Sequence, residues 1–390
     1  MKLSTYALFL VFSTALFGAG LYDSELCVSP LDVRANERGE KGVLSVGGSA
    51  SFRGAYQFDY DNAPDPYRQS RLRGSFEAKC VNKNGFFRII ASATKEEAKQ
   101  AAARSDAELS EAYFQTRLSD AADIKIGRQI VVWGKSDMLR VTDALNPLDM
   151  QEPAMSDIGD LRLGVAMARL DYYIGDWNLQ AIAIPETRFT KRPRTPSEFS
   201  PYSLSDTNKP EGVQGALAAI GVFEGWDLSL YAASLFADEV RDHKRNAMLG
   251  AAAAVAIGDF VIKTETALWR ENGFDSKRFD LLIGAEYAGV RDATIAFEMM
   301  TRFTKNDDRE GAFSTRIQRD LLNASLRLSA TATINLNDGE SGGAARLQGD
   351  YDMADNYLLT IGYVDYFGSL EPYKSFDRNA RAFAQVKVSF

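Results

Sequence analysis

The segment Leu44–Tyr60 reads LSVGGSASFRGAYQFDY and alternates along its length between two kinds of side chain. Its even-numbered positions, such as Val46 and Phe52, are apolar, aromatic or small, and its odd-numbered positions are mostly polar. Successive side chains of a β-strand point to opposite faces, so this period of two predicts a strand with one apolar and one polar face. The same alternation recurs over 71–79, 226–231 and 326–333. The sequence therefore predicts an all-β chain.

The connections between the alternating segments differ in length. Short turns rich in Gly, Asp and Asn are followed by longer polar stretches at 61–69, 95–107, 187–211, 304–313 and 368–379. A soluble β-sandwich would also alternate apolar and polar residues. Short turns at one end and long loops at the other are instead typical of outer-membrane barrels. We therefore expect a single transmembrane, antiparallel, up-and-down β-barrel.

Aromatic residues flank the short turns. Tyr172 and Trp177 lie on either side of one turn, Phe223 and Trp226 lie on either side of the next, and Phe260 follows a third. Amphipathic rings favour the headgroup level of a bilayer, so their recurrence predicts an aromatic girdle at one end of the barrel. The alternative is ordinary cross-strand pairing of hairpin aromatics.

The last nine residues, Ala382–Phe390, read AFAQVKVSF and end the chain on an aromatic residue. A barrel must pair its last strand with its first, because lipid cannot satisfy an open edge. The ending resembles the C-terminal signal of bacterial outer-membrane proteins. This resemblance implies that the barrel assembly machinery reads Val386, Val388 and Phe390. Chance alternation is the alternative interpretation.

The alternating segments number eighteen, an even count that places both ends of the chain on the periplasmic side. If 314–336 is one long bent strand, the count is 16. We expect the barrel to occupy residues 42–390 without an internal repeat or a domain linker. The expected strands are 43–60, 70–81, 85–94, 108–118, 122–131, 164–174, 176–186, 212–223, 226–238, 246–257, 259–270, 278–289, 292–303, 314–321, 325–336, 343–352, 356–367 and 380–390.

The first residues predict export from the cytoplasm. A basic start, an apolar stretch over 3–17 and the small residues 18–20 follow one another in the order of a cleaved secretory signal peptide, here 1–20. An uncleaved membrane anchor is the alternative. Residues 21–41 form a polar periplasmic leader. The expected location is the bacterial outer membrane, in contact with its lipids and with lipopolysaccharide.

The chain has two cysteines, Cys27 in the leader and Cys80 at the turn end of its expected strand. The periplasm is oxidising, so a Cys27–Cys80 disulfide that ties the leader to the barrel is expected. Two unpaired thiols are the alternative.

Composition excludes several classes of function. The chain has 390 residues, 45% of them hydrophobic and 25% charged, with a net charge of -8. An acidic chain disfavours nucleic acid as a partner, because phosphates need basic surface. The single histidine, His243, lies in a polar loop and offers little to hydrolytic catalysis. We therefore expect no enzyme activity, no cofactor and no metal.

Charged residues occupy the polar face of many expected strands and should line the lumen. Basic residues dominate the first half of the chain, and acidic ones are commoner on the later strands. Opposed basic and acidic walls would bias permeation by charge. The alternative is a salt-bridged lining that only fills the interior. The lumen-wall candidates are Arg53, Arg71, Arg73, Arg88, Arg117, Arg169, Glu265 and Glu298.

Alternation fails over 132–163, the connection after the fifth strand. This long segment is apolar, and exposed apolar residues would form an adhesive patch. We expect it to fold into the barrel as a constriction, with helical spacing over 136–145. An outward subdomain is the alternative. The expected constriction residues are Arg128, Trp133, Lys135, Asp137, Arg140, Asp143 and Asp149.

The sequence GRQ at 127–129, WGKS at 133–136 and Asn146-Pro147 resembles a motif in a group of uncharacterised proteobacterial outer-membrane barrels, catalogued as a domain of unknown function. The resemblance implies a β-barrel that works with inner-membrane exporters of the resistance-nodulation-division type and with a periplasmic lipoprotein. It implies transport of a hydrophobic or lipid-like molecule, and it assigns no catalytic residues.

We therefore expect a channel or transporter that passes small or lipophilic molecules across the outer membrane. A structural or adhesive barrel is the first alternative. An outer-membrane enzyme that modifies lipids is the second.

Overall fold

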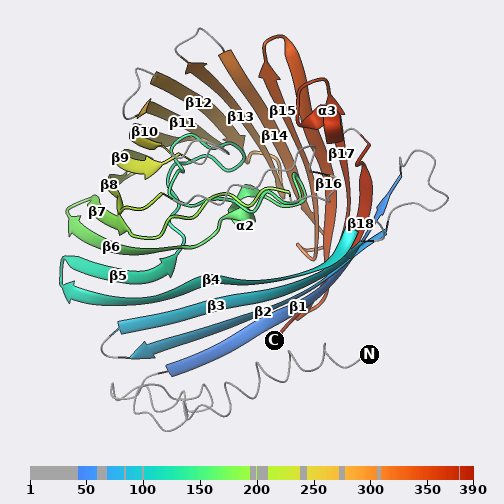
Figure 1. Cartoon of the computed structure of the whole chain (residues 1–390), viewed down its shortest axis with the longest axis horizontal. Helices are drawn as coiled ribbons and strands as arrows, with labels where there is room; N and C mark the ends of the chain where they lie inside the picture. The colour runs from blue at the N-terminus through green and yellow to red at the C-terminus, as the bar shows by residue number, and fades with distance from the viewer. Residues whose placement is uncertain are drawn as a thin grey trace.

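The computed structural model describes residues 43–58, 68–82, 85–98, 101–193, 199, 210–237, 244–271, 277–304, 309–376 and 378–390. Eighteen antiparallel strands pair in chain order, and β18 pairs with β1, so that the sheet closes on itself (Figure 1). The expected barrel and its eighteen strands are confirmed. The 16-strand alternative is wrong, because a turn at 322–325 separates β14 from β15.

The strands vary from eight to nineteen residues in length. They are β1 (Val43–Gln57), β2 (Arg68–Asn82), β3 (Gly85–Ala98), β4 (Ala101–Ser119), β5 (Ala122–Gln129), β6 (Val165–Ile174), β7 (Trp177–Ile184), β8 (Gln214–Phe223), β9 (Trp226–Phe236), β10 (Arg245–Ile257), β11 (Phe260–Glu271), β12 (Lys277–Tyr287), β13 (Ala293–Thr304), β14 (Arg309–Leu321), β15 (Leu326–Asn337), β16 (Glu340–Ala354), β17 (Tyr357–Gly368) and β18 (Arg381–Ser389). Two four-residue helices, α2 (Ile158–Leu161) and α3 (Tyr373–Phe376), complete the described elements.

Two expected loops are wrong. The described residues of this stretch, 95–98 and 101–107, extend β3 and β4, with Glu96 opposite Arg104 and Lys95 opposite Ser105. β14 already begins at Arg309, inside the expected loop 304–313. Both stretches carry several charged side chains, such as Glu96, Arg104 and Arg309, and neither shows the regular apolar alternation of the other strands. Sequence alternation therefore ended before the strands did.

The outer surface is apolar. Side chains such as Phe52, Leu217 and Ile361 point outward and are 56%, 58% and 58% exposed. The aromatics at the short turns point the same way and also pair across strands, as Phe223 does with Trp226, with a ring-centroid distance of 4.2 Å. Headgroup-level exposure and cross-strand pairing thus occur together. Within the described residues, no helix is long and apolar enough to cross a membrane.

The last residue closes the barrel. The backbone N–H of Phe390 donates to the carbonyl of Gly48 at 3.0 Å, and the N–H of Gly48 donates to the carbonyl of Phe390 at 2.9 Å. The ladder continues with Val388 opposite Ala50 and Val386 opposite Phe52. The C-terminal residues therefore seal the edge that lipid could not satisfy.

The segment between β5 and β6, residues 130–164, folds into the barrel, where Figure 1 shows it crossing the interior. Its apolar side chains pack against small inward residues of the wall, including Ala218, Ala252 and Ala267. This contact is the main apolar core of the molecule. The expected inward fold is confirmed, and the outward subdomain is excluded.

Candidate functional site: a lumen narrowed by an inward loop

Asn146 fixes the neck of the inward loop, which we define as residues 130–164. Its Oδ1 accepts from the N–H of Val131 at 2.8 Å, and its Nδ2 donates to the carbonyl of Leu163 at 2.8 Å. The N–H of Leu163 also donates to the carbonyl of Pro147 at 2.8 Å. A single buried amide therefore joins the two ends of the loop, which gives a structural reason for the Asn146-Pro147 pair.

Glu265 of β11 anchors the loop to the wall. Its Oε1 accepts from the N–H groups of Lys135 and Ser136 at 2.6 and 2.7 Å, and its Oε2 accepts from the N–H and Oγ1 of Thr142 at 3.0 and 2.8 Å. Gly134 has a φ of +84°, and a Cβ there would lie 2.5 Å from Glu265 Oε1. Only glycine allows the backbone to approach this carboxylate so closely.

Glu298 of β13 is a second anchor, two strands along the wall. Its Oε1 accepts from the N–H of Asp137 at 2.8 Å, and its Oε2 accepts from the N–H groups of Met138 and Leu139 at 3.1 and 2.8 Å. Ser136 Oγ adds a bond of 2.6 Å. Hydrogen bonds to an ionised acceptor are stronger than neutral ones.

The helix expected over 136–145 is wrong, and the two glutamates explain why. An α-helix needs its N–H groups to bond to carbonyls four residues earlier. Here the N–H groups from Lys135 to Leu139, and that of Thr142, are taken by carboxylates of the wall. The segment therefore wraps around two acidic side chains instead of coiling.

Trp133 covers the apolar side of the loop. It is 1% exposed and stacks on Tyr231 of β9, with ring centroids 4.6 Å apart. Val131, Leu139 and Val141 are buried in the same cluster. This side of the lumen is therefore filled.

Glu152 holds the far end of the loop to the opposite wall. It contacts Arg53 of β1 and Arg71 of β2, each at 2.6 Å, and Gln69 Nε2 at 2.8 Å. Burial alone would raise the pKa of Glu152, but the charges of Arg53 and Arg71 lower it to about 2. The carboxylate is therefore ionised at any physiological pH, and the loop spans the lumen from β11–β13 to β1–β2.

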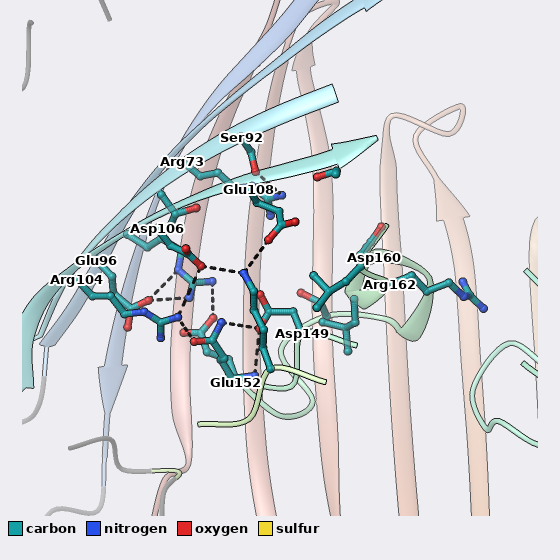
Figure 2. Close-up of a pocket in the computed structure, with 18 residues that line it drawn as sticks. Arg73, Ser92, Glu96, Arg104, Asp106, Glu108, Asp149, Glu152, Asp160 and Arg162 are labelled. Carbon is teal, nitrogen blue, oxygen red and sulfur yellow. Dashed lines mark hydrogen bonds and ion pairs between the residues drawn. The ribbon is translucent and has the colours of Figure 1, made fainter. Parts of the chain in front are cut away.

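A cavity of about 150 Å³ remains between the loop and the inner faces of β2, β3 and β4 (Figure 2). Its lining is polar and carries both signs of charge. The basic side chains are Arg71, Arg73, Arg104, Arg162 and Lys191, and the acidic ones are Glu96, Asp106, Glu108, Asp149, Glu152 and Asp160.

Arg73 differs from the other arginines of this lining. Its single hydrogen bond to a described residue is a long one, 3.5 Å to Ser92 Oγ, and it forms no ion pair within the described part of the chain. Arg71 lies two residues earlier on the same face of β2, and it binds Glu96 and Glu152 instead. Arg73 therefore offers a cation to a solute in the cavity.

The expected constriction residues are distributed over several roles. Asp149 lines the cavity. Two others bind the wall: Lys135 pairs with Asp227 at 2.8 Å, and Asp137 pairs with Lys263 at 2.6 Å. Arg140 and Asp143 pair with each other at 3.2 Å inside the loop.

The two remaining expected constriction residues lie in or against the wall. Trp133 is in the core described above. Arg128 is the last residue but one of β5 and lies on the outward-facing register, opposite Ala112 and Ala166, where it pairs with Glu186 at 2.6 Å.

Most of the expected lumen-wall residues are paired. Arg53 and Arg71 bind Glu152, Arg88 binds Glu77 at 2.7 Å and Glu111 at 3.0 Å, and Arg169 binds Asp171 at 2.8 Å. Arg117 lies near the short turn with its side chain 73% exposed. Glu265 and Glu298 do not face water, because the loop covers them. The structure therefore does not show an acidic wall and a basic wall that face each other across an open, water-filled lumen.

Sequence reasoning missed the loop's own contribution to the cavity. Glu152, Asp160 and Arg162 lie where alternation had failed, so parity could not assign them a face. Asp106 lies in the expected loop 95–107, and Glu108 is the first residue of the expected strand 108–118. One feature of the sequence could have indicated these cavity residues: charged residues are dense close to the apolar segment.

Some expectations fall outside the described residues. These include the signal peptide 1–20, the leader 21–41, Cys27 and His243. Cys80 is 7% exposed near the end of β2, and the Cys27–Cys80 disulfide stays a prediction. Within the described residues, no group of three or more His, Cys, Asp or Glu could hold a metal ion.

The fold and the inward loop define an outer-membrane-type β-barrel. The chain belongs to the family described as protein of unknown function (DUF1302), whose model matches residues 29–336. The resemblance to an uncharacterised family is thereby confirmed. No curated protein matches the chain.

Several solved barrels share the fold. Acinetobacter baumannii OccAB3 has a TM-score of 0.55 at 12% identity, with 89% of this chain and 99% of that chain covered. A. baumannii OccAB1 has a TM-score of 0.56 at 10% identity, with 88% and 96% covered. Pseudomonas aeruginosa OpdK, in a structure with vanillate, has a TM-score of 0.54 at 12% identity, with 89% and 98% covered.

Proposed function

We propose that this chain is an outer-membrane channel that passes small charged or amphipathic molecules. The observation that carries this proposal is the cavity between the inward loop and the wall of β2–β4. The loop fills one side of the lumen with apolar contacts and leaves the other side polar. A passage lined by both charges replaces part of the hydration shell of a charged solute.

Arg73 gives the passage its expected preference. The other cations of this lining each pair with a carboxylate, so the cation of Arg73 is the one most open to a solute. An anionic or zwitterionic solute fits it better than a cation does. Arg73→Glu should therefore shift ion preference towards cations, whereas Arg327→Glu, an exposed arginine paired with Asp320, should leave it unchanged.

Planar-bilayer conductance tests the proposal directly. Replacing 136–158 by a short Gly/Ser bridge should leave a folded barrel, because the strand ladder does not include this loop. Conductance and uptake of large antibiotics should rise several-fold. An inserted barrel whose conductance matches the wild type would show that the loop does not narrow the passage.

The finer features of transport are part of the same proposal. We place the protein in the outer membrane after cleavage of 1–20, inserted by the barrel assembly machinery. An apolar outer surface and a sealed β1–β18 junction support this location. The family resemblance favours a lipid-like cargo and a link to a resistance-nodulation-division exporter through a periplasmic lipoprotein. This link is tested by cross-linking the barrel in cells, purifying it, and asking whether such an exporter is purified with it.

A further inference from the structure

The wall of the barrel has a step between β4 and β5. The ladder between these strands covers only Ala112–Ser119 of β4, because β5 ends at Gln129 and the chain then turns into the lumen. Residues 101–111 of β4 pair with β3 on one side and have no strand of the described chain on the other. The wall above Ala112 is therefore not closed by backbone hydrogen bonds.

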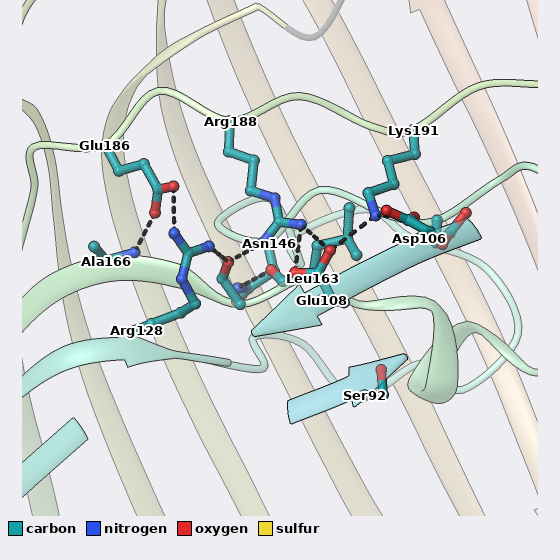
Figure 3. Close-up of polar contacts among 12 residues, drawn as sticks. Ser92, Asp106, Glu108, Arg128, Asn146, Leu163, Ala166, Glu186, Arg188 and Lys191 are labelled. Atoms are coloured by element: carbon teal, nitrogen blue, oxygen red, sulfur yellow. Dashed lines mark hydrogen bonds and ion pairs between the residues drawn. The ribbon is translucent and has the colours of Figure 1, made fainter. Parts of the chain in front are cut away.

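Side chains close this step instead. The segment 186–191, which follows β7, runs beside β4 and reaches it through two cations (Figure 3). Arg188 donates to both oxygens of Glu108 at 2.6 and 2.7 Å. Lys191 Nζ binds Asp106 at 3.0 Å and Glu108 at 2.8 Å. We call residues 106, 108, 188 and 191 the latch.

The loop approaches the same edge with side-chain hydrogen bonds, such as that from the N–H of Ile130 to Glu111, and with no backbone ladder between the described residues. A Cβ on Gly164 would lie 1.9 Å from the carbonyl oxygen of Ser110, so the two backbones are in direct contact. The carbonyl of Gly164 accepts from Arg128 and Arg188, at 2.8 and 2.7 Å. This junction holds by packing and side-chain bonds, which separate more readily than a ladder.

The two sides of the latch differ in chemistry. Outside, Leu109, Ile126 and Val132 are 43%, 51% and 55% exposed. Leu109–Leu118 is about the ten residues that a tilted strand needs to cross the hydrocarbon core, so the step begins at the level of the outer leaflet. Inside, Asp106, Glu108 and Lys191 line the cavity that also holds Arg73.

We propose that the latch closes a lateral exit from the cavity into the outer leaflet, and that its ligand is an anionic amphiphile. This inference rests on the proposed channel function and names its substrate class. The head group, a carboxylate or a phosphate, binds Arg73 in the polar cavity. The acyl chain leaves through the step towards Leu109 and Ile126. The cavity thereby holds the head group of the amphiphile, and the step admits its acyl chain.

Charge reversal of the latch tests the exit. Arg188→Glu places two like charges together and should raise transfer of a fluorescent fatty acid, or of a fluorescent lysophospholipid, between proteoliposomes and solution about fivefold. Glu108→Arg combined with Arg188→Glu restores the pair and should return transfer to the wild-type rate. Arg327→Glu is the matched control with no expected effect. The two probes distinguish a carboxylate head from a phosphate head.

A covalent lock gives the opposite test. Glu108→Cys combined with Arg188→Cys, with the two thiols joined by a bis-maleimide, should stop amphiphile transfer and leave single-channel conductance for chloride unchanged. Unchanged amphiphile transfer in the locked, conducting barrel would overturn the lateral exit and leave the channel proposal intact. A barrel that conducts no ions before or after the lock would instead remove the channel proposal. Heat-modifiable gel mobility confirms that every variant is folded.

Discussion

Glu152 is the residue on which the far end of the loop depends. Its folded pKa of about 2 lies below the usual 4.5, because Arg53 and Arg71 outweigh the cost of burial. A depressed carboxylate pKa stabilises the folded loop above the unfolded pKa, and that contribution is lost as pH falls through the folded pKa. The contact with β1 and β2 should therefore persist from pH 7 to about pH 5 and weaken progressively below that pH.

Channel noise measures this contact. Wild-type gating events should stay rare and constant from pH 7 to about pH 5 and rise progressively below that pH, whereas Glu152→Gln should gate frequently already at pH 7. Arg53 and Arg71 would then face a neutral amide, so the loop end loses its charged partner. A wild-type channel whose gating already rises near pH 6, or stays unchanged down to pH 3, would contradict the assigned pKa.

At the scale of elements, Glu298 connects β13 to a loop that begins after β5. Glu298→Gln should loosen the loop, because the amide keeps one acceptor oxygen and turns an NH2 group towards at least one of the three backbone N–H groups. The expected loss is about 1–3 kcal/mol of docking free energy, with raised conductance noise and faster proteolysis within 136–158. Glu310→Gln is the control, since Glu310 is a partly exposed partner of Arg302. Equal protease resistance in both variants would argue against the anchor.

The same anchors mark the limit of sequence reasoning. Strands such as β1, β11 and β17 followed from their period of two, since that period reports local backbone geometry. The path of 135–142 did not, because its acceptors, Glu265 and Glu298, lie more than a hundred residues away along the chain. Local apolar spacing favoured a helix there. Contacts at such separations leave no local pattern.

The candidate site divides in the same way. Parity placed Arg53, Arg71 and Arg73 on the lumen side before any contact was known. It could not place Glu152, which has no strand register. Nor could it show that the acidic wall residues Glu265 and Glu298 are used to bind backbone, because charge alone does not reveal what covers it.

The whole barrel depends on the seal between Gly48 and Phe390. Deleting Phe390 removes the last two backbone hydrogen bonds between β18 and β1. Unfolded chain should then accumulate in the periplasm, and folded barrel in membranes should fall at least several-fold. Phe390→Tyr keeps both bonds and the ring, and should insert normally. Normal yield of the truncated chain by gel mobility would reject a role for the terminal residue.

The glutamate anchors also impose an order on biogenesis. The chain emerges with the loop long before β11 and β13, so the N–H groups of residues 135–139 lack their carboxylate acceptors while the first ten strands form. Their final contacts arise only after those later strands have joined the growing sheet. The loop can consequently pack against β6–β10 early, but both glutamates fix its path only late in the construction of the barrel.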